Sequence, residues 1–342
     1  MNKPVVVIPN INGEDGLVDC INSLLAQTIP LHLIVVDNNS KDGSVGLIKE
    51  QYPDIELIIN NENLGYTGGV NPGFKRAIEL DTTYVAPFNN DAVADPRWIE
   101  ELIAILEKHP EAGIASCKVL SADGTHIDST GDYYTNWGLP YPRGRNETDI
   151  SKYDGETEIF AGSGAASLYR VAMLKEVGLF DQDFFAYYED VDLSFRAQLA
   201  GWKVLFVPTS IVYHETGSTS SKIKGFTTYQ TMKNEPMLLW KNLPTRYLFT
   251  VGWRFLLAHT LFFLRALSRG QGWTALKGDA QGTRLLIKKY EERKRIQGSK
   301  KVSDEYIWNM MVHDLPPNAH ALRSLRAKWW KLNGKNTDEN SN

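Results

Sequence analysis

Cysteine is scarce in this chain, because Cys20 and Cys117 are the only two in 342 residues. Two cysteines cannot build a disulfide framework, and neither has the spaced partners of a zinc site. The N-terminus also lacks the basic, apolar and small-residue pattern of a signal peptide, and a strand-like run begins at Val5. We therefore expect a protein of the reducing cytosol.

Two signatures of nucleotide binding are absent as well. No glycine-rich loop ends in Gly-Lys-Ser/Thr, which argues against a P-loop NTPase. No Gly-X-Gly-X-X-Gly loop is present, which argues against an oxidoreductase that binds a dinucleotide. With 42% hydrophobic and 23% charged residues, the chain still has the composition of a protein with a sizeable core.

A long uninterrupted apolar run is also missing. The segment 247–267 is rich in apolar and aromatic residues, but Arg254, His259 and Arg265 interrupt it. Its uncharged stretches are shorter than the ~20 residues that a membrane-spanning helix needs. On a helix, Arg254, Arg265 and Arg269 fall on one side. This pattern describes a helix in a membrane interface or one packed on the rest of the protein, and both alternatives stay open.

Acidic and basic residues are distributed unevenly along the chain. From Lys241 to the end there are 19 Lys and Arg against 8 Asp and Glu, and the totals of 37 and 41 leave 18 against 33 for the first 240 residues. So acidic a segment would repel nucleic acid, and we expect no nucleic-acid partner. The basic C-terminal part suits an anionic membrane surface, or it is a solvated helical surface.

Strand-like and helix-like segments alternate in the first half, which predicts βαβ units and a mostly parallel sheet. The predicted strands are Val5–Ile8, Leu33–Val36, Ile55–Ile59 and Tyr84–Phe88, and the predicted helices are Leu17–Gln27, Ser44–Gln51, Asn71–Leu80 and Trp98–Lys108. Farther on we expect a strand over Ile159–Tyr169, helices over Arg170–Val177 and Val191–Gly201, a strand at Lys203–Val207 stopped by Pro208, and a basic helical tail over Lys288–Lys301. A change in composition places the domain boundary near residue 244.

Polar residues follow several of the predicted strands, where ligands of open α/β sheets bind. Asp37 ends one strand and can accept a hydrogen bond from a pyrimidine base, although an ordinary Asx turn explains it too. The glycine-rich segment 63–73 lets backbone N–H groups approach a phosphate, with Pro72 expected in the first turn of a helix. Asp91 can hold Mg²⁺ or Mn²⁺ on a diphosphate, or it belongs to a polar turn.

The acidic and aromatic segment 184–196 gives the strongest single indication of function. Glu189, Asp190 and Asp192 lie within four positions, and carboxylates crowded beside aromatic rings favour a raised pKa and a general base. Asp192 and Arg196 can pair on a helix. The alternative is a cluster that caps a helix N-terminus. His214, by itself, is an ordinary structural histidine.

Taken in order, these segments resemble the family-2 glycosyltransferases with the GT-A fold, and specifically bacterial rhamnosyltransferase-type members. The resemblance covers residues 1–245 and depends on the order of motifs that are individually weak. They are Val7-Ile8-Pro9-Asn10, Val36-Asp37-Asn38-Asn39-Ser40, Asn63-Leu64-Gly65-Tyr66, Asn89-Asn90-Asp91, residues 185–193, Gly201-Trp202, Val212-Tyr213-His214 and Lys241-Asn242-Leu243-Pro244.

The resemblance implies roles for individual residues. Asp190 matches the catalytic base, with Glu189 and Asp192 close to acceptor hydroxyls. Asp91 and His214 match the metal site, with Mn²⁺ or Mg²⁺ as cofactor. The nucleotide-sugar donor is expected at Pro9, Asn10, Asp37, Asn39, Asn63, Gly65, Gly69, Asn90 and Asp91, and the acceptor at Gly162, Ser163, Gly164 and Arg196. Two positions depart from the family pattern: Asn89 replaces the first Asp of an Asp-X-Asp motif, and Asn234-Glu235 replaces a frequent Asn-Arg pair.

We therefore predict an α/β GT-A domain over residues 1–244 and a helical C-terminal extension over residues 245–342. The predicted reaction is inverting, metal-dependent transfer of L-rhamnose from dTDP-L-rhamnose to a polyprenyl-linked or growing polysaccharide acceptor, at the inner face of the membrane. A UDP- or GDP-sugar donor on the same fold is the nearest alternative. A non-catalytic protein that binds a nucleotide sugar is another. Acceptor specificity is expected in residues 131–153 and in the C-terminal part.

Overall fold

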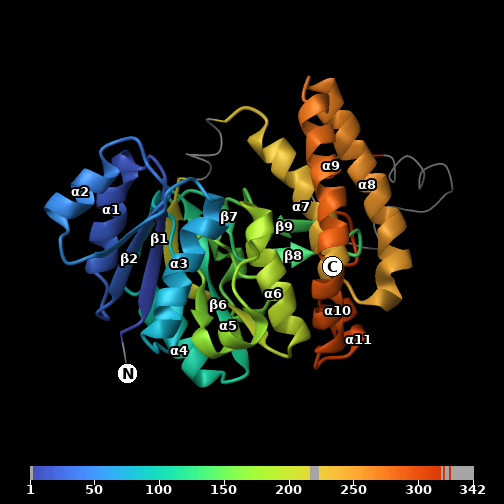
Figure 1. Cartoon of the computed structure of the whole chain (residues 1–342). Coiled ribbons are helices and arrows are strands. Elements are labelled where there is room, and N and C mark those ends of the chain that lie inside the picture. Colours follow the sequence, from blue (N-terminus) through green and yellow to red (C-terminus); the bar gives the residue numbers. More distant parts are fainter. Residues whose placement is uncertain (1–2, 216–222, 317–318, 320–322, 325–342) are drawn as a thin grey trace.

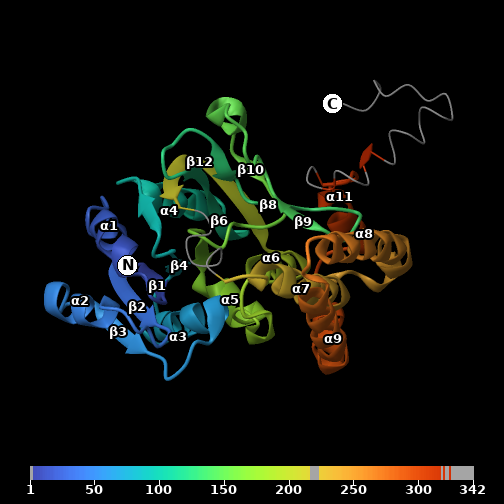
Figure 2. The same cartoon turned by 90° about the horizontal axis from the view of Figure 1, so that it is seen from above.

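A ten-stranded sheet with helices on both faces forms the main body of the protein (Figures 1 and 2). The computed structural model describes residues 3–215, 223–316, 319 and 323–324. The sheet order is β10-β12-β6-β11-β4-β1-β2-β3, with β5 paired to β12 and β7 paired to β6. The C-terminal helices pack beside this body at one end, as both views show.

The first half has the predicted βαβ alternation. Strands β1 to β4 pair in parallel in the order β4-β1-β2-β3. The strands are β1 (Val5–Asn10), β2 (His32–Asp37), β3 (Glu56–Ile59) and β4 (Tyr84–Pro87), and the helices are α1 (Glu14–Leu25), α2 (Ser44–Gln51), α3 (Gly65–Glu79) and α4 (Trp98–Lys108). The strand and helix predictions for this half are therefore confirmed to within a few residues, except at the start of α3.

The core divides between the two faces of the sheet because side chains alternate along each strand. In β1, Val6 and Ile8 pack in the cluster with α1 and α4, whereas Val5 and Val7 pack in the cluster with α3, α5 and α6. All four side chains are buried, as expected for a parallel strand covered on both sides. Because helices cover both faces of β1, its carboxyl end, where Asn10 lies, is held in a defined position.

The glycine-rich segment is more helical than predicted. Helix α3 begins at Gly65, so Pro72 lies in its interior rather than in its first turn. Gly65 has a φ of +71°, and a side chain there would meet the Phe185 backbone. Gly69 lies on the buried face of α3, where a Cβ atom would be 2.8 Å from Pro9 Cβ. The glycines therefore allow close helix–strand packing, and only Gly65 is at the helix start.

The middle of the chain extends the sheet with antiparallel as well as parallel pairs. Its strands are β5 (Ala92–Ala94), β6 (Ala112–Ser121), β7 (Ile127–Ser129), β10 (Thr157–Glu158), β11 (Leu168–Arg170) and β12 (Lys203–His214); β8 (Asp132–Tyr134) and β9 (Pro140–Pro142) form a separate hairpin. Helices α5 (Val171–Val177) and α6 (Glu189–Leu199) confirm the two predicted here.

Two strand predictions in this region are wrong. The strand expected over Ile159–Tyr169 is interrupted, because residues 162–167 form a loop and only β11 follows it. The strand expected to stop at Pro208 continues to His214 in β12. The pairing of β12 with β6 shifts register between Val207 and Ile211. Pro208, which has no backbone N–H to donate, therefore lies where the regular hydrogen bonding between the two strands is interrupted.

After β12, the described residues form five named α-helices. They are α7 (Phe226–Asn242), α8 (Leu248–Ser268), α9 (Gly272–Lys288), α10 (Tyr290–Gly298) and α11 (Asp304–Met310). The expected basic helix over Lys288–Lys301 is instead the end of α9 followed by α10. One hydrophobic cluster joins Phe160 and Phe195 with Leu238, Val251 and Phe255. The predicted boundary at residue 244 therefore stays a prediction, and the segments on its two sides share a core.

Helix α8 differs from the expectation that its charges leave it too short to span a bilayer. By length and composition, Thr245–Ser268 could cross a membrane, and 17% of its most apolar window is buried. Val251, Phe255 and Ala258 face the protein, whereas Phe249, Trp253 and Leu256 are 86%, 51% and 65% exposed. Helix α8 thus has an apolar face that the rest of the described chain does not cover.

Candidate active site

A cavity of about 800 Å³ lies at the carboxyl ends of β1, β2 and β4. The loop after β4, the β8–β9 hairpin and helices α6, α7 and α8 supply further lining residues. The predicted site residues that line this cavity are Pro9, Asn10, Asn63, Gly65, Asn90, Asp91, Ser163, Gly164, Glu189, Asp190 and His214. The structure therefore brings together most of the residues that the sequence singled out.

The predicted base-binding residues form a hydrogen-bonded group at the ends of β1 and β2. Asn10 and Asp37 are paired in register, and Asn10 Nδ2 donates to Asp37 Oδ2 at 3.0 Å. The Ser40 hydroxyl and backbone N–H donate to the same carboxylate. Asn90 Nδ2 donates to Asn10 Oδ1 at 2.7 Å, which connects this group to the loop after β4. Asp37 itself lies behind the lining residues and is 1% exposed.

Two asparagines position the start of α3. Asn38 Nδ2 donates to the Gly65 carbonyl, and Asn63 Oδ1 accepts from the Gly65 N–H. Asn38, which the sequence analysis left without a role, lines the cavity. Asn39 and Gly69 do not line it: Asn39 points to the carbonyl of Asn61, and Gly69 packs against Pro9. Direct donor contact is therefore not proposed for these two.

Asp91 and His214 meet at the end of the cavity formed by β4 and β12. His214 Nε2 lies 3.2 Å from Asp91 Oδ1, and Nδ1 lies 3.1 Å from Asp128 Oδ2. Arg145 pairs with the other oxygen of Asp128 at 2.5 Å. Burial opposes protonation of His214, but the hydrogen bonds to Asp128 and Asp91 outweigh it and raise its pKa to about 9. Without a metal ion, these contacts favour the protonated imidazole, and a metal ion bound at Nε2 would replace its proton.

The same residues are suitable ligands for a divalent cation. Carboxylate oxygen and imidazole nitrogen are ligands that Mn²⁺ accepts. The buried Asn89 Oδ1 makes no hydrogen bond within the described chain, although Asn89 Nδ2 lies 3.1 Å from His214 Nε2. Among residues 3–215, 223–316, 319 and 323–324, no group of three or more His, Cys, Asp and Glu side chains is placed to hold a metal. Asp91 and His214 would therefore leave most coordination positions of such a cation to other ligands, such as water or a diphosphate.

The aromatic segment before α6 has an unusual backbone. Phe185, Tyr187 and Tyr188 have positive φ angles of 65°, 70° and 70°. Such angles are unfavourable for bulky residues and persist where surrounding contacts hold them. The buried Asn234 supplies such contacts, because its Nδ2 donates to the carbonyls of Phe184, Ala186 and Tyr187. Asn234 therefore holds the backbone of the segment that precedes Glu189.

Asp190 lies where the aromatic segment enters α6, and its carboxylate is fixed by backbone donors. The Gly164 N–H donates to Oδ2 at 2.7 Å and the Val191 N–H to Oδ1 at 2.8 Å. Burial nevertheless raises the pKa of Asp190. Burial also raises the pKa of Glu189 well above its usual value, and the charge of Asp190 adds to this effect. The two neighbouring carboxyls differ in their hydrogen bonds. Both oxygens of Asp190 accept from backbone N–H groups, whereas the buried Glu189 Oε2 has no hydrogen-bond partner in the described chain.

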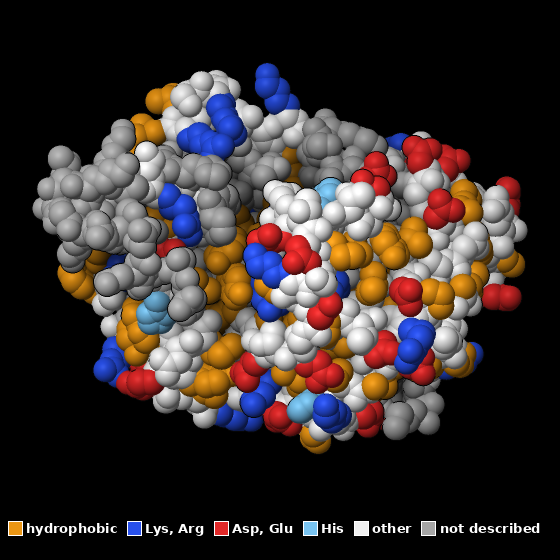
Figure 3. All heavy atoms as spheres, turned by 180° about the vertical axis from the view of Figure 1, so that it is seen from behind, with side chains coloured by type: hydrophobic (Ala, Val, Ile, Leu, Met, Phe, Trp, Pro, Cys, Tyr) orange, Lys and Arg blue, Asp and Glu red, His pale blue; other side chains and the backbone are white. Residues whose placement is uncertain are grey.

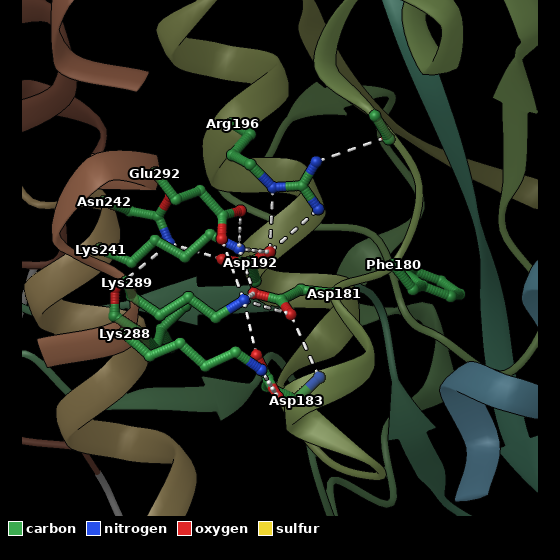
Figure 4. A network of polar contacts seen from close by, with 12 residues as sticks. Phe180, Asp181, Asp183, Asp192, Arg196, Lys241, Asn242, Lys288, Lys289 and Glu292 are labelled. Atoms are coloured by element: carbon green, nitrogen blue, oxygen red, sulfur yellow. Dashed lines mark hydrogen bonds and ion pairs between the residues drawn. The ribbon is translucent and has the colours of Figure 1, made fainter. Parts of the chain in front are cut away.

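Asp192 and Arg196 lie outside the cavity, in a buried network of ion pairs (Figure 4). Asp192 is completely buried and accepts hydrogen bonds from Arg196, Lys241 and Asn242 at 2.9, 3.0 and 2.7 Å. Arg196 also donates to backbone carbonyls before α6. The expectation of acceptor contacts for Asp192 and Arg196 is therefore corrected, because both side chains are already fully bonded on the far side of α6.

The predicted acceptor loop divides in a similar way. Ser163 and Gly164 line the cavity, whereas Gly162 lies behind them and donates from its N–H to the Ser194 hydroxyl at 3.3 Å. A Cβ atom on Gly164 would be 2.8 Å from Asp190 Oδ2. Close approach of this backbone to the carboxylate therefore requires glycine. Gly162 is not assigned an acceptor contact.

Sequence reasoning missed Asp132 and Asp128, which come from the irregular middle segment and line the cavity. Burial raises the pKa of Asp132 well above its usual value, and the nearby charge of Asp190 adds to this. Neither aspartate belongs to a motif, and their distance along the chain from α6 hides the contact. The one available signal was the expectation that residues 131–153 contact the acceptor, and the β8–β9 hairpin does supply Asp132, Pro140 and Tyr141 to the lining.

Comparison with known proteins connects this geometry to one family. The family model described as "Glycosyltransferase like family 2" matches residues 4–228. An N-acetylglucosaminyl-diphospho-decaprenol L-rhamnosyltransferase of Mycobacterium tuberculosis is 29% identical over 215 residues, which cover 57% of this chain and 70% of that protein. An O-antigen biosynthesis protein of Myxococcus xanthus is 27% identical over 227 residues, covering 63% of this chain and 18% of that much longer protein.

Solved structures agree on the fold. A mannosyltransferase of Pyrobaculum calidifontis, in complex with GDP-Man and Mn²⁺, has a TM-score of 0.52 at 15% identity. The superposition covers 94% of this chain and 87% of the mannosyltransferase. S. aureus TarS (residues 1–349) has a TM-score of 0.51 at 16% identity, with 87% and 90% covered. The fold is that of the GT-A glycosyltransferases, and residues from several of the motifs named above line one cavity in it. The chain is a glycosyltransferase and belongs to glycosyltransferase family 2.

Proposed function

We propose that this glycosyltransferase transfers L-rhamnose from dTDP-L-rhamnose, with inversion, to a lipid-linked or growing cell-surface polysaccharide. The observation that carries the proposal is the separation of two acidic groups in one cavity, Asp91 with His214 at the sheet edge and Asp190 at the start of α6. An inverting transfer needs a base on the acceptor side and a neutralising group beside the leaving diphosphate. The likeness to the mycobacterial rhamnosyltransferase supports the choice of donor and acceptor class.

Asp190 is the proposed base. Its carboxylate takes the proton from an acceptor hydroxyl as that O–H bond breaks. The freed oxygen attacks the anomeric carbon, and the bond from this carbon to the diphosphate breaks, with the electron pair leaving on the diphosphate. The N–H groups of Gly164 and Val191 hold the carboxylate in place, and burial raises its pKa toward a value that suits proton abstraction. Glu189 and Asp132 lie beside it on the same cavity wall.

Asp91 and His214 would hold Mn²⁺ or Mg²⁺ against the donor. A divalent cation at this place would offset the negative charge that develops on the leaving diphosphate. Asn10, Asn38 and Asn63 would surround the nucleotide, because they line the cavity at the ends of β1 and β2 and at the start of α3. Asp37 supports this part from behind through Asn10.

A panel of nucleotide sugars, each with and without Mn²⁺, tests the proposed donor. We expect dTDP-L-rhamnose with Mn²⁺ to raise the melting temperature most and to be hydrolysed slowly without acceptor. The Asp91→Asn variant should lose the metal dependence of both signals, because its carboxylate is the only acidic metal ligand proposed. A stronger response to a UDP- or GDP-sugar would remove the rhamnose assignment and keep the transferase. Binding without hydrolysis of any donor would instead favour a non-catalytic nucleotide-sugar-binding protein.

We further propose that the protein works on the cytoplasmic face of the membrane, held there peripherally by the exposed apolar face of α8. Full-length protein should sediment with vesicles that contain anionic phospholipid. The Phe249→Glu/Leu256→Glu variant should bind them at least about tenfold more weakly, because each buried apolar side chain contributes roughly 1.5–3 kcal/mol. Leu25→Glu/Ile59→Glu is the matched control, since these side chains are 59% and 49% exposed on the opposite part of the protein. Equal loss in both variants would refute a role specific to α8.

A further inference from the structure

The last turns of α8 belong to two surfaces at once. Phe262, Arg265, Ala266 and Arg269 line the cavity. Leu264 and Leu267, from the same turns, are 51% and 57% exposed and continue the apolar face of α8. At about 100° per residue, Arg265 and Arg269 fall on the cavity side of the helix, and Leu264, the nearer of the two leucines, lies about 100° around the helix from Arg265. The end of α8 therefore presents a pair of arginines to a polar cavity and an apolar surface on its other side.

The two arginines differ from the other basic side chains near the cavity. Within the described part of the chain, neither Arg265 nor Arg269 forms a side-chain hydrogen bond or an ion pair, and both are exposed. By contrast, Arg145 pairs with Asp128, and Arg254 lies over the Trp253 ring. Residues four apart on a helix are neighbours, so the two guanidinium groups can act on one ligand. They present two positive charges without partners at the edge of a cavity otherwise rich in carboxylates.

Adjacent guanidinium groups match the geometry of phosphate oxygens, which they bind through paired N–H donors. The exposed apolar side chains on the other side of the same turns, Leu264 and Leu267, suit a hydrocarbon chain. Figure 3 shows basic and hydrophobic side chains together on the tip of the molecule where α8 ends and α9 begins. The ligand that fits this juxtaposition is amphiphilic, with a phosphorylated end at the cavity and a lipid tail outside it.

We propose that Arg265 and Arg269 bind the diphosphate of a polyprenyl-linked acceptor. This inference rests on the proposed function and adds to it the residues that recognise the acceptor. The sugar of the acceptor would then extend into the cavity toward Asp190, and the tail would lie against the exposed side of α8. The donor diphosphate is separate from this site, since its proposed ligands Asp91 and His214 are on the sheet edge.

Farnesyl diphosphate is a suitable probe for the full-length protein, with calorimetry as the measurement. The nucleotide diphosphate that stabilises the protein most is kept saturating, so that the donor site is occupied. We expect Arg265→Ala/Arg269→Ala to weaken farnesyl diphosphate binding by about 100-fold, because two charge-assisted contacts are lost. The control Lys277→Ala/Arg284→Ala removes the same charge from exposed positions of α9 outside the cavity and should change binding less than about twofold.

Three results would overturn the proposal. Equal affinity for farnesol and farnesyl diphosphate would show that the apolar surface alone binds. Competition between farnesyl diphosphate and the nucleotide, with equal loss of both in the arginine variant, would assign the arginines to the donor. Unchanged or undetectable farnesyl diphosphate binding would remove the site altogether. Failure of dTDP-L-rhamnose hydrolysis in the wild-type protein, with arginine-dependent lipid diphosphate binding retained, would instead count only against the proposed donor.

Discussion

Asp190→Asn should lower sugar transfer by about 10³-fold or more while the variant still binds the nucleotide, because general-base catalysis contributes roughly 10²–10⁴-fold and the amide cannot take the proton. The asparagine keeps the shape of the side chain, and its oxygen can still accept from the Gly164 N–H. The measurement is the transfer rate with saturating donor, together with the nucleotide affinity of the same preparation.

The pH profile gives an independent check on Asp190. Burial raises the pKa of this carboxyl, so the wild-type protein should gain activity as the pH rises through a value above that of an ordinary aspartate. Residual activity of Asp190→Asn should lack this acid limb. Asp54→Asn, in an exposed turn outside the cavity, is the control and should match the wild type in rate and profile. Transfer by Asp190→Asn within tenfold of the wild-type rate would reject Asp190 as the base.

Removal of Lys241 should have the largest effect on stability. Its ammonium group is completely buried and pairs with Asp181, Asp192 and Glu292 at 2.7, 3.0 and 2.9 Å. Lys241→Ala leaves these carboxylates without their shared cation, and breaking a buried pair costs about 3–5 kcal/mol. We expect a clear fall in the melting temperature and in the denaturant midpoint, with the unfolding transition followed by fluorescence.

Lys288→Ala is the matched control for Lys241→Ala. Lys288 also pairs with an aspartate, Asp183, at 2.8 Å, but its side chain is 64% exposed. Exposed pairs contribute about 0–1 kcal/mol, so this variant should unfold almost like the wild type. Equal destabilisation by the two alanines would mean that burial does not determine the strength of the network.

The first half of the sheet could be predicted from the sequence because each strand and helix has its own pattern of apolar residues over a short segment. The alternation of β-branched strands with amphipathic helices predicted β1 to β4 and three of the four helices α1 to α4, and the ordered motifs predicted that Asp91, Asp190 and His214 meet in one site. The glycines of α3 misled the prediction, since their tight packing against Pro9 depends on a neighbouring strand. The same holds for Pro208, whose irregularity depends on the pairing with β6.

Whether a side chain of a motif faces the cavity or a buried network depends on residues far away in the sequence. Asp190 and Asp192 are two positions apart and were both expected to touch the substrates. Asp192 is instead on the other side of α6, where Lys241 and Asn242 bind it. No local pattern shows that α7 supplies these partners. Asp132 was missed for the same reason, because only the folded chain places the β8–β9 hairpin beside Asp190.

The network around Lys241 also limits how this protein can be recombined with its relatives. Helix α6 carries Asp190 on the cavity side and Asp192 on the side bound by α7, and Lys289, between α9 and α10, donates to Asp181 in the same network. A chimaera that takes its C-terminal helices from another family member inherits foreign partners for these charges. To exchange acceptor specificity between such enzymes, the matching aspartates would have to be transferred together with the helices. The segment that can be exchanged as a unit is therefore larger than the C-terminal part alone.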